Sequence, residues 1–382
     1  MSVEVRRDTP KGKSLHATRH IPKDTVIFEE DPLICCQLAW NAACKYRACD
    51  HCLRPLETAE ENSQRLTGKP AYSLPYPEFC QTKKEDITSC PDCGVEYCSE
   101  ICKTIANEQY HRVLCLQSHE RNMTHPLEQL EEAWKHSHYP PETSSIFLLV
   151  RLLARIVQSP NKDEAIRTTL DFCHRSVNED AELAHKFLGA KFAHNLDLFR
   201  ELIGKALPNE GIEQFLTPEG FRSLVALIGT NGQGVGSSPF SVWTSNIEKA
   251  NLDHEEKEKI NSFIDKTYEQ MFDHTGDFLN SEGVGLYLQQ SCANHSCEPN
   301  AEIKFLHNNF RLSLFAIRDI EPNEEVLISY LDECSLNRSR HSRQKALMEN
   351  YLFTCDCLKC LREIDDPDMT SEEEMSDEDC DD

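Results

Sequence analysis

The sequence has little that would place the protein in a membrane or outside the cell. It contains no run of about 18 consecutive apolar residues, the length that indicates a membrane-spanning helix. Its first residues, Met1 to Asp8, have no apolar core of the kind that a signal peptide carries. We therefore expect a soluble intracellular protein of the cytoplasm or nucleus, whose 19 cysteines are reduced and available to bind metal ions.

Positive charge is also scarce. The 40 Lys and Arg against 65 Asp and Glu give a formal net charge of -25, which argues against binding nucleic acid through its phosphates. A basic protein or peptide is the more natural partner, and an ordinary solvated acidic surface is the alternative. Residues 363–382 contain 12 acids and no Lys or Arg, so we expect a disordered acidic tail there. No internal repeat is present, and no periodic helical pairs follow residue 360.

Strand and helix patterns alternate along a chain that exceeds one typical core. Strand-like runs lie near both ends, at 25–28, 33–36, 285–288, 301–305, 310–316 and 325–330. Between them lie a cysteine-rich block (49–115), a helical pattern (127–225) that is most apolar at 146–157, a glycine-rich passage (229–236) that predicts turns, and a second helical stretch (251–278). We expect an α+β protein whose sheet core is split in sequence by an insertion.

The cysteine-rich block offers eight metal ligands in four close pairs. They are Cys49 and Cys52, Cys90 and Cys93, Cys98 and Cys102, and His111 and Cys115. Each pair can supply two vertices of a tetrahedral Zn²⁺ site, so eight ligands satisfy two closed, structural sites. The alternative, buried cysteines without metal, fits poorly with the polar residues between the pairs.

This spacing resembles that of a MYND zinc finger. The resemblance implies that one ion is held by Cys49, Cys52, Cys98 and Cys102, and the second by Cys90, Cys93, His111 and Cys115. It also implies roles in binding proline-rich peptides or other protein partners, or in assisting nucleic-acid contact. The block departs from the family pattern because 37 residues, 53–89, separate its first two pairs.

A compact polar loop, Asn294-His295-Ser296-Cys297-Glu298-Pro299-Asn300, lies between two strand-like runs. By itself such a loop usually satisfies turn hydrogen bonds. Downstream, Cys355, Cys357 and Cys360 offer three thiolates but need a fourth ligand for zinc, and Cys297 supplies it if the two segments meet. Metal binding would then contribute to folding this part of the protein.

The loop, the Ile328-Ser329-Tyr330 strand end, the last cysteine cluster and the zinc-binding block together resemble the SET-and-MYND-domain lysine methyltransferases over about residues 1–362. The sequence is most similar to the divergent fifth branch of that family, which has a long MYND insertion, no C-terminal helical repeat domain and an acidic tail. The resemblance implies a split SET β-fold with an N-terminal part (1–48), a MYND-type zinc finger (49–115), a helical SET insertion (116–225), a SET catalytic core (226–333), a zinc-binding post-SET segment (334–362) and a disordered acidic tail (363–382).

The resemblance also implies roles for individual residues. Asn294 and His295 would bind S-adenosylmethionine (AdoMet), and Phe353 would stack on its adenine. Tyr330 would be the catalytic tyrosine in contact with the cofactor, and Tyr351 would wall the lysine channel. Further cofactor contacts are implied at Lys11, Gly12, Lys13, Asn231 and Ser291, where the turn Gly12-Lys13-Ser14 replaces the Gly-x-Gly of many SET proteins.

Methyl-transfer chemistry accounts for these residue types. Transfer from a sulfonium is an in-line displacement, so the amine and the methyl group must be aligned and water excluded. Lysine, with a reference pKa near 10.4, must lose a proton, which an aromatic channel and the nearby sulfonium both favour. A tyrosine hydroxyl can orient the amine, and aromatic faces tolerate the methylated cation. The alternative for Tyr330 and Tyr351 is an ordinary core tyrosine with one hydrogen bond.

The sequence thus predicts an AdoMet-dependent protein-lysine N-methyltransferase with three structural Zn²⁺ ions. We expect a monomer that acts on a basic protein, either a histone tail such as H4 or H3 or a non-histone target such as a ribosomal protein, and that binds neither membrane nor nucleic acid directly. The alternative is a MYND-based interaction scaffold or transcriptional regulator with a catalytically silent SET domain. A cysteine protease is not indicated, since no single Cys-His pair stands out among 16 histidines.

Overall fold

The computed structural model describes the backbone of residues 2–9, 11–137, 145–173, 185–276 and 279–370. Within these ranges the strands are β1 (Val3–Thr9), β2 (Gly12–Ala17), β3 (Val26–Glu30), β4 (Ile34–Gln37), β5 (Thr88–Ser89), β6 (Glu96–Tyr97), β7 (Gly232–Ser237), β8 (Ser281–Leu286), β9 (Asn294–His295), β10 (Ala301–Lys304), β11 (Leu312–Ala316) and β12 (Leu327–Ile328).

The sheets join the two ends of the sequence. β10, β11 and β3 form one antiparallel sheet, and β4, β8 and β7 form another in which β8 is central. β1 and β2 form a hairpin, while β9 pairs in parallel with β12. Strands before residue 40 therefore pair with strands after residue 280, and the sheet core is split in sequence as predicted.

The helices account for most of the chain between these strands. They are α1 (Trp40–Ala43), α2 (Ala59–Leu66), α3 (Glu100–Ala106), α4 (Arg112–Leu114), α5 (Pro126–Ser137), α6 (Ile146–Gln158), α7 (Lys162–Leu170), α8 (His185–Ala206), α9 (Pro218–Asn231), α10 (Pro239–Glu248), α11 (His254–Thr275), α12 (Glu333–Asn337), α13 (Arg340–Tyr351) and α14 (Leu358–Arg362). Short 3-10 or π turns are η1 (Pro77–Phe79), η2 (Lys84–Asp86), η3 (Asn107–His111), η4 (Glu213–Leu216) and η5 (Gln290–Cys292).

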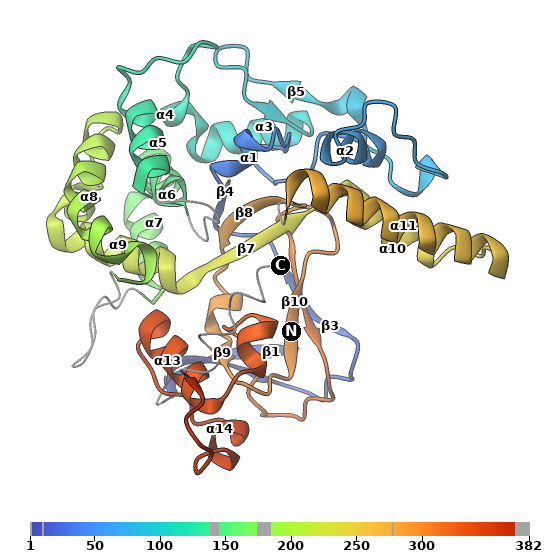
Figure 1. Ribbon diagram of the computed structural model, residues 1–382. Coiled ribbons are helices and arrows are strands. Elements are labelled where there is room, and N and C mark those ends of the chain that lie inside the picture. The colour runs from blue at the N-terminus through green and yellow to red at the C-terminus, as the bar shows by residue number, and fades with distance from the viewer. Residues whose placement is uncertain (1, 10, 138–144, 174–184, 277–278, 371–382) are drawn as a thin grey trace.

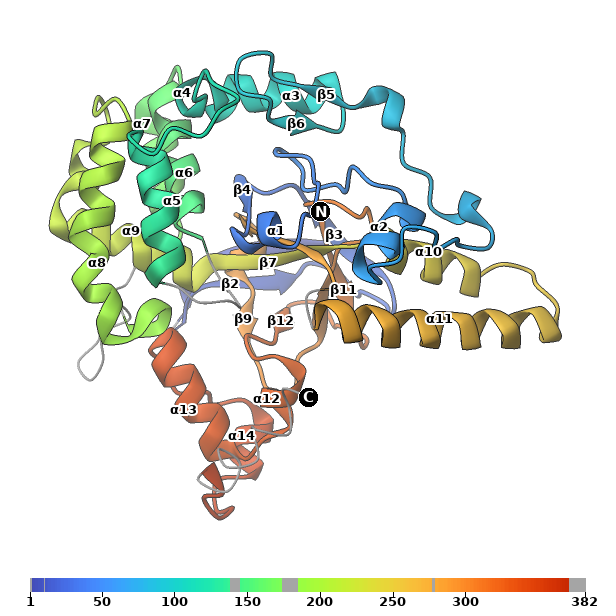
Figure 2. The ribbon, with the colours of Figure 1, turned by 45° about the horizontal axis from the view of Figure 1, so that its top comes forward.

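Helices α5 to α9 gather on one side of the sheets, with the cysteine-rich segment above them and α13 and α14 at the opposite end (Figures 1 and 2). α6 is the central helix of this group. Ser145 caps it by accepting a hydrogen bond from the Phe147 amide at 3.2 Å. Because α6 packs against η3, β4, α7 and α9, its apolar residues are buried nearly all round, as expected for a helix inside a core.

Arg151 of α6 links three parts of the fold. Its largely buried guanidinium forms an ion pair with Asp50, which lies between two cysteines of the zinc-binding block. It also donates to the backbone carbonyl of Asp50 at 2.6 Å and to that of Cys35, in β4, at 3.0 Å. A buried guanidinium needs such partners, so this contact fixes the helical segment and the cysteine-rich segment to the sheet.

The long segment between the first two cysteine pairs, residues 53–89, packs against α10 and α11. Trp243 of α10 donates through Nε1 to the carbonyls of Pro75 and Tyr76, each at 3.1 Å. The hydroxyls of Tyr72 and Thr267, the latter in α11, lie 2.6 Å apart. The segment is therefore held by specific hydrogen bonds to two helices.

Two local expectations differ from the structure. The glycine-rich passage does not form turns: its first part ends α9, and Gly232 to Ser237 form β7. Glycine is needed at position 232 because the strand begins close to the backbone of α9, and a Cβ there would lie 2.6 Å from the Ile228 carbonyl oxygen. The strand expected over 325–330 is shorter, because only Leu327 and Ile328 pair with β9.

The predicted acidic tail lies outside the described residues from 371 onward. Among the described residues, no helix is both long and apolar enough to cross a membrane.

Candidate active site and metal centres

The polar loop at 294–300 is fastened to the chain that leads to Tyr330. Leu327 pairs with Asn294, and Ile328 pairs with His295. Asn300 is fully buried and bonds both ways: its Nδ2 donates to the Glu325 carbonyl at 2.8 Å, and its Oδ1 accepts from the Leu327 amide at 2.7 Å. Buried backbone groups require hydrogen-bond partners, and the Asn300 side chain satisfies those of Glu325 and Leu327. This role explains why a polar residue is buried at position 300.

Asn294 connects the same loop to the β1–β2 hairpin. Its Nδ2 donates to the Lys13 carbonyl at 2.9 Å and to Glu325 Oε1 at 2.8 Å. Glu325 also forms an ion pair with Lys11 at 3.2 Å. Between the two lysines, Gly12 has a φ of 84°, a conformation that favours glycine. Four of the predicted cofactor contacts therefore lie together, at Lys11, Gly12, Lys13 and Asn294.

His295 joins the loop to both the tyrosine and the cysteine cluster. The ring is buried, and its Nδ1 accepts a hydrogen bond from the Tyr330 amide at 2.9 Å. In the neutral imidazole, Nε2 then carries the hydrogen, and it lies 3.3 Å from Cys297 Sγ. Both ring nitrogens of His295 therefore have partners within the protein.

Aromatic rings from two segments surround this point. The Tyr330 ring centre lies 4.8 Å from that of Tyr351 and 6.3 Å from that of Phe353. The Tyr330 hydroxyl donates to the Ala293 carbonyl at 2.8 Å, and that of Tyr351 donates to the Tyr330 carbonyl at 3.3 Å. Burial raises the pKa of Tyr330 above its usual value and that of Tyr351 to about 12, so both phenols stay protonated at neutral pH. Each phenol already donates its one hydrogen to a backbone carbonyl, so these hydroxyls can orient a partner by accepting a hydrogen bond through oxygen, but they are poor bases.

Lys13 also reaches the far end of α7. Its ammonium lies 2.7 Å from the carboxylate of Asp171, to which Arg7 donates at 2.7 and 3.1 Å. Hydrogen bonds from Arg7, together with Lys13, lower the pKa of Asp171 to about 2. Two cations from the hairpin thus converge on one carboxylate beside the predicted cofactor contacts.

Two other predicted cofactor contacts use their side chains differently. Asn231 is buried at the end of α9, where its Nδ2 donates to the carbonyls of Cys173 and Leu227 at 2.7 and 2.8 Å. Ser291, in η5, donates to the Leu288 carbonyl at 3.1 Å. Among the described residues, neither side chain forms a hydrogen bond to the hairpin or to Asn294.

Eleven of the cysteines, together with His111, form three clusters. The members are Cys49, Cys52, Cys98 and Cys102; Cys90, Cys93, His111 and Cys115; and Cys297, Cys355, Cys357 and Cys360. In each, the four ligand atoms lie within 4.8 Å of one another. These are the three groupings that the sequence implied, and each could hold a metal ion.

Individual separations in the clusters match a tetrahedral zinc site. Sulfurs that each lie about 2.3 Å from one ion are about 3.8 Å apart. Cys52 and Cys98 Sγ are 3.6 Å apart, and Cys90 and Cys115 Sγ are 3.9 Å apart. Cys93 Sγ lies 3.6 Å from His111 Nε2. The donor set of thiolates and one imidazole is the one that structural Zn²⁺ prefers.

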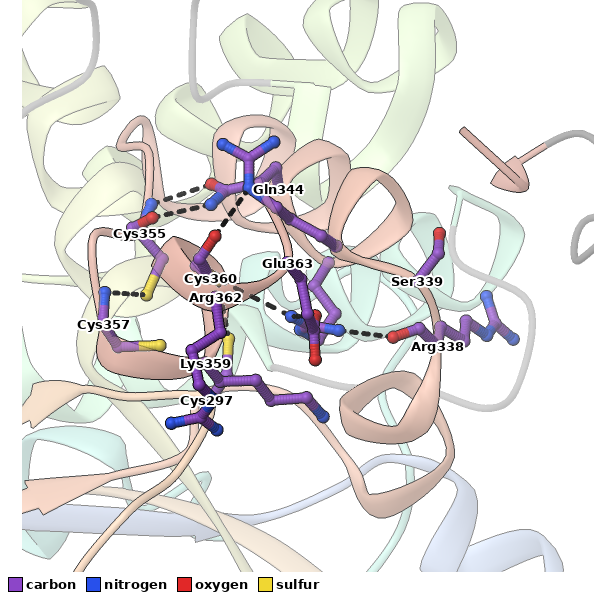
Figure 3. Close-up of polar contacts among 12 residues, drawn as sticks. Cys297, Arg338, Ser339, Gln344, Cys355, Cys357, Lys359, Cys360, Arg362 and Glu363 are labelled. Carbon is purple, nitrogen blue, oxygen red and sulfur yellow. Dashed lines mark hydrogen bonds and ion pairs between the residues drawn. The ribbon is translucent and has the colours of Figure 1, made fainter. Parts of the chain in front are cut away.

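The third cluster lies next to the aromatic rings. Cys297 and Cys360 Sγ are 3.6 Å apart, and Figure 3 shows Cys355 and Cys357 on the same segment as Cys360. The hydrogen bond that Cys297 and Cys355 share lowers the pKa of Cys355 and raises that of Cys297, so the two thiols share one proton between them. Cys297 thus brings the 294–300 loop to the segment that carries Tyr351 and Phe353.

Sequence reasoning missed several residues at these sites. Arg7, Asp171 and Glu325 hold the predicted cofactor contacts, and Arg343 and Glu363 lie beside the third cluster. No local spacing marks these charged residues, because their partners are distant in sequence.

Comparison with known proteins gives the family. The family model described as SET domain matches residues 12–331, so the chain belongs to the SET-domain family. Protein-lysine N-trimethyltransferase SMYD5 of Homo sapiens is 52% identical over 374 residues, which cover 98% of this chain and 90% of that protein. The Gallus gallus protein of the same name is 53% identical over 364 residues, covering 95% and 87%.

A shorter match links the chain to a second type of relative. Histone-lysine N-methyltransferase SMYD3 of Mus musculus is 43% identical over 93 residues, which cover 24% of this chain and 21% of that protein. Together the matches assign the chain, within the SET-domain proteins, to the SMYD group, as the sequence motifs predicted.

Proposed function

We propose that the chain is an AdoMet-dependent protein-lysine N-methyltransferase that trimethylates lysine in a basic protein. The observation that carries this proposal is the convergence of Asn294 and His295 with Tyr330, Tyr351 and Phe353 in a SET-domain protein. Trimethylation is proposed because the SMYD5 relatives are named protein-lysine N-trimethyltransferases. A histone tail such as H3 or H4, or a ribosomal protein, has the positive charge that suits a chain of net charge -25.

The residues present fit the parts of AdoMet. Lys13 is paired with Asp171, but because Arg7 shares that carboxylate, the Lys13 ammonium would still attract the methionine carboxylate. Phe353, which is partly exposed, offers a ring face for adenine. The backbones of Asn294 and His295 supply the remaining polar contacts of the cofactor, with lesser contacts at Lys11, Gly12, Asn231, Ser291 and Tyr330. When bound, AdoMet supplies the methyl group as an electrophilic sulfonium.

The chain's own residues would orient the amine and exclude water. Tyr330 and Tyr351 form an aromatic wall that favours the neutral lysine amine and then tolerates the methylated cation. The Tyr330 hydroxyl, a protonated phenol held at the Ala293 carbonyl, is the group placed to orient the reacting nitrogen. No side chain in this arrangement is required to act as a general base.

Three structural zinc ions, one for each cluster, complete the proposal. Two would hold a MYND-type finger at 49–115, and the third would hold a post-SET segment at 334–362 against the SET core at 226–333. The N-terminal part, 1–48, and the helical insertion, 116–225, would complete the SET domain. Closed sites of four protein ligands leave no vertex for substrate, so all three would act through folding.

Calorimetry with zinc-loaded protein tests the proposal. We expect AdoMet to bind, and we expect its demethylated product, S-adenosylhomocysteine, to compete with it. Absence of binding by either molecule would contradict the proposed activity and favour a MYND-based interaction scaffold.

A further inference from the structure

A buried arginine lies beside the third cysteine cluster. The Arg343 side chain is only 1% exposed, yet it carries a guanidinium. Its Nη2 donates to Glu363 Oε2 at 2.6 Å and lies 3.7 Å from Cys360 Sγ. Its Nη1 donates to the Arg338 carbonyl. A buried cation requires anionic partners, and here they are one carboxylate and the cysteine cluster.

The charge of a zinc-thiolate centre explains why a cation is placed there. Four thiolates around one Zn²⁺ carry a net charge of about -2, which is costly in a buried site. Cys297, Cys355 and Cys360 are all buried. Burial itself disfavours the charged guanidinium, and the Glu363 carboxylate, 2.6 Å from Nη2, supplies the opposite charge that it requires. Arg343 can therefore offset part of the thiolate charge from inside the protein.

Arg343 belongs to a face of α13 that holds the cysteine segment. Arg340 donates to the Cys360 carbonyl at 3.0 Å. Gln344 bonds to both backbone groups of Cys355, donating to its carbonyl at 2.6 Å and accepting from its amide at 2.8 Å, as Figure 3 shows. Positions 340, 343 and 344 share one helix face. Only Arg343 of these three reaches a sulfur atom in the described contacts, which distinguishes it from its neighbours.

We propose that Arg343, oriented by Glu363, donates a hydrogen bond to the Cys360 thiolate and offsets its charge, so that the third zinc ion is held more tightly while this pair is intact. The proposal rests on the zinc assignment made above. Partners of this kind, one bond beyond the ligands, typically change metal affinity by about 10 to 100-fold. Glu363 is also the first residue of the acidic terminal segment, so this segment would begin at the metal centre.

The test uses the full chain with its metals exchanged for ¹¹³Cd, whose resonance reports the electron density of each site separately. The variants are Arg343→Lys and Glu363→Gln. Arg65→Lys is the matched control, since Arg65 is also paired with a buried carboxylate, Glu57, but contacts none of the cluster cysteines in the described contacts. The second readout is the zinc released by the native metal form to a chromogenic chelator.

We expect three cadmium resonances in the unaltered chain, of which one moves in Arg343→Lys and Glu363→Gln while none moves in Arg65→Lys. One zinc ion of three should leave about 10 to 100 times faster in both variants. If Arg343→Lys disturbs folding, the resonances and the zinc release of Glu363→Gln alone decide whether the pair supports the third site. Three unshifted resonances and unchanged release in Glu363→Gln would overturn the role of the pair. Fewer than three metals in the unaltered chain would overturn the zinc assignment, and with it this inference.

Discussion

Removing one ligand of the third cluster should unfold a defined part of the protein. In Cys297→Ser, we expect loss of one zinc ion of three and loss of amide protection across α13. The apolar core around this cluster is small: its buried members are Leu347 and the three thiols Cys297, Cys355 and Cys360. Burial of one leucine contributes about 1.5–3 kcal/mol, whereas a structural zinc ion contributes about 10–16 kcal/mol.

The metal therefore dominates the local stability. A loss of only about 4 kcal/mol would already lower the protection of the α13 amides about 1000-fold, since each 1.4 kcal/mol is a factor of ten. The assay is hydrogen exchange followed by mass spectrometry, with zinc content measured on the same sample. Peptides from β4 and β8 provide an internal reference, because these strands pair with each other in a separate sheet and contain no member of the third cluster.

Cys334→Ser is the matched control, since Cys334 lies in α12 of the same segment but is exposed and belongs to none of the three clusters. It should keep all three zinc ions and wild-type protection. Wild-type exchange across α13 in Cys297→Ser, despite the loss of one zinc ion, would refute the reasoning. Cys297→Ser should also bind AdoMet more weakly, because His295 contacts both Cys297 and the Tyr330 amide.

Two further variants test contacts that hold the fold. Asp50→Asn leaves the largely buried Arg151 guanidinium without its carboxylate and should cost about 3–5 kcal/mol in urea unfolding, part of which Arg151→Met should restore in the double variant. A loss below about 1 kcal/mol would contradict this account. Trp243→Phe removes the donor to the Pro75 carbonyl, while the Tyr76 carbonyl keeps the Phe79 amide as a donor at 3.2 Å. We expect a cost of about 1–3 kcal/mol, seen as faster exchange of residues 59–89 at unchanged AdoMet affinity; slow exchange there would be the contrary result.

Sequence patterns were sufficient to predict structure where a residue type has one dominant structural role. Closely spaced cysteines predicted metal ligands, and the clusters contain the predicted members. Apolar residues at 146–157 predicted the helix that forms α6. The family and the methyltransferase class, predicted from the 294–300 loop and its downstream partners, are confirmed by the comparisons.

Long-range charge pairs could not be predicted in this way. Asp171 meets Lys13 across 158 positions, and Asp50 meets Arg151 across 101. A single charged residue has no periodicity, and most such residues lie on solvated surfaces, so nothing local marks the few that pair inside the fold.

The prediction of turns in the glycine-rich passage, 229–236, was wrong for a related reason. Glycine is enriched in turns, but here Gly232 admits close packing within a strand whose partner, β8, is about 50 residues away. Only the tertiary structure separates these two uses of glycine.

The central claim is that the chain transfers methyl groups to lysine with the help of Tyr330. The most direct measurement is transfer from labelled AdoMet to proteins of a cell extract, read by mass spectrometry of methylated lysines, for the unaltered chain and for Tyr330→Phe. Tyr287→Phe is the control, since the hydroxyl of this buried tyrosine also donates to a backbone carbonyl, that of Phe310. We expect lysine methylation by the unaltered chain and by Tyr287→Phe, and a rate at least about 100-fold lower for Tyr330→Phe. Equal transfer by Tyr330→Phe, or none by the unaltered chain, would contradict the account.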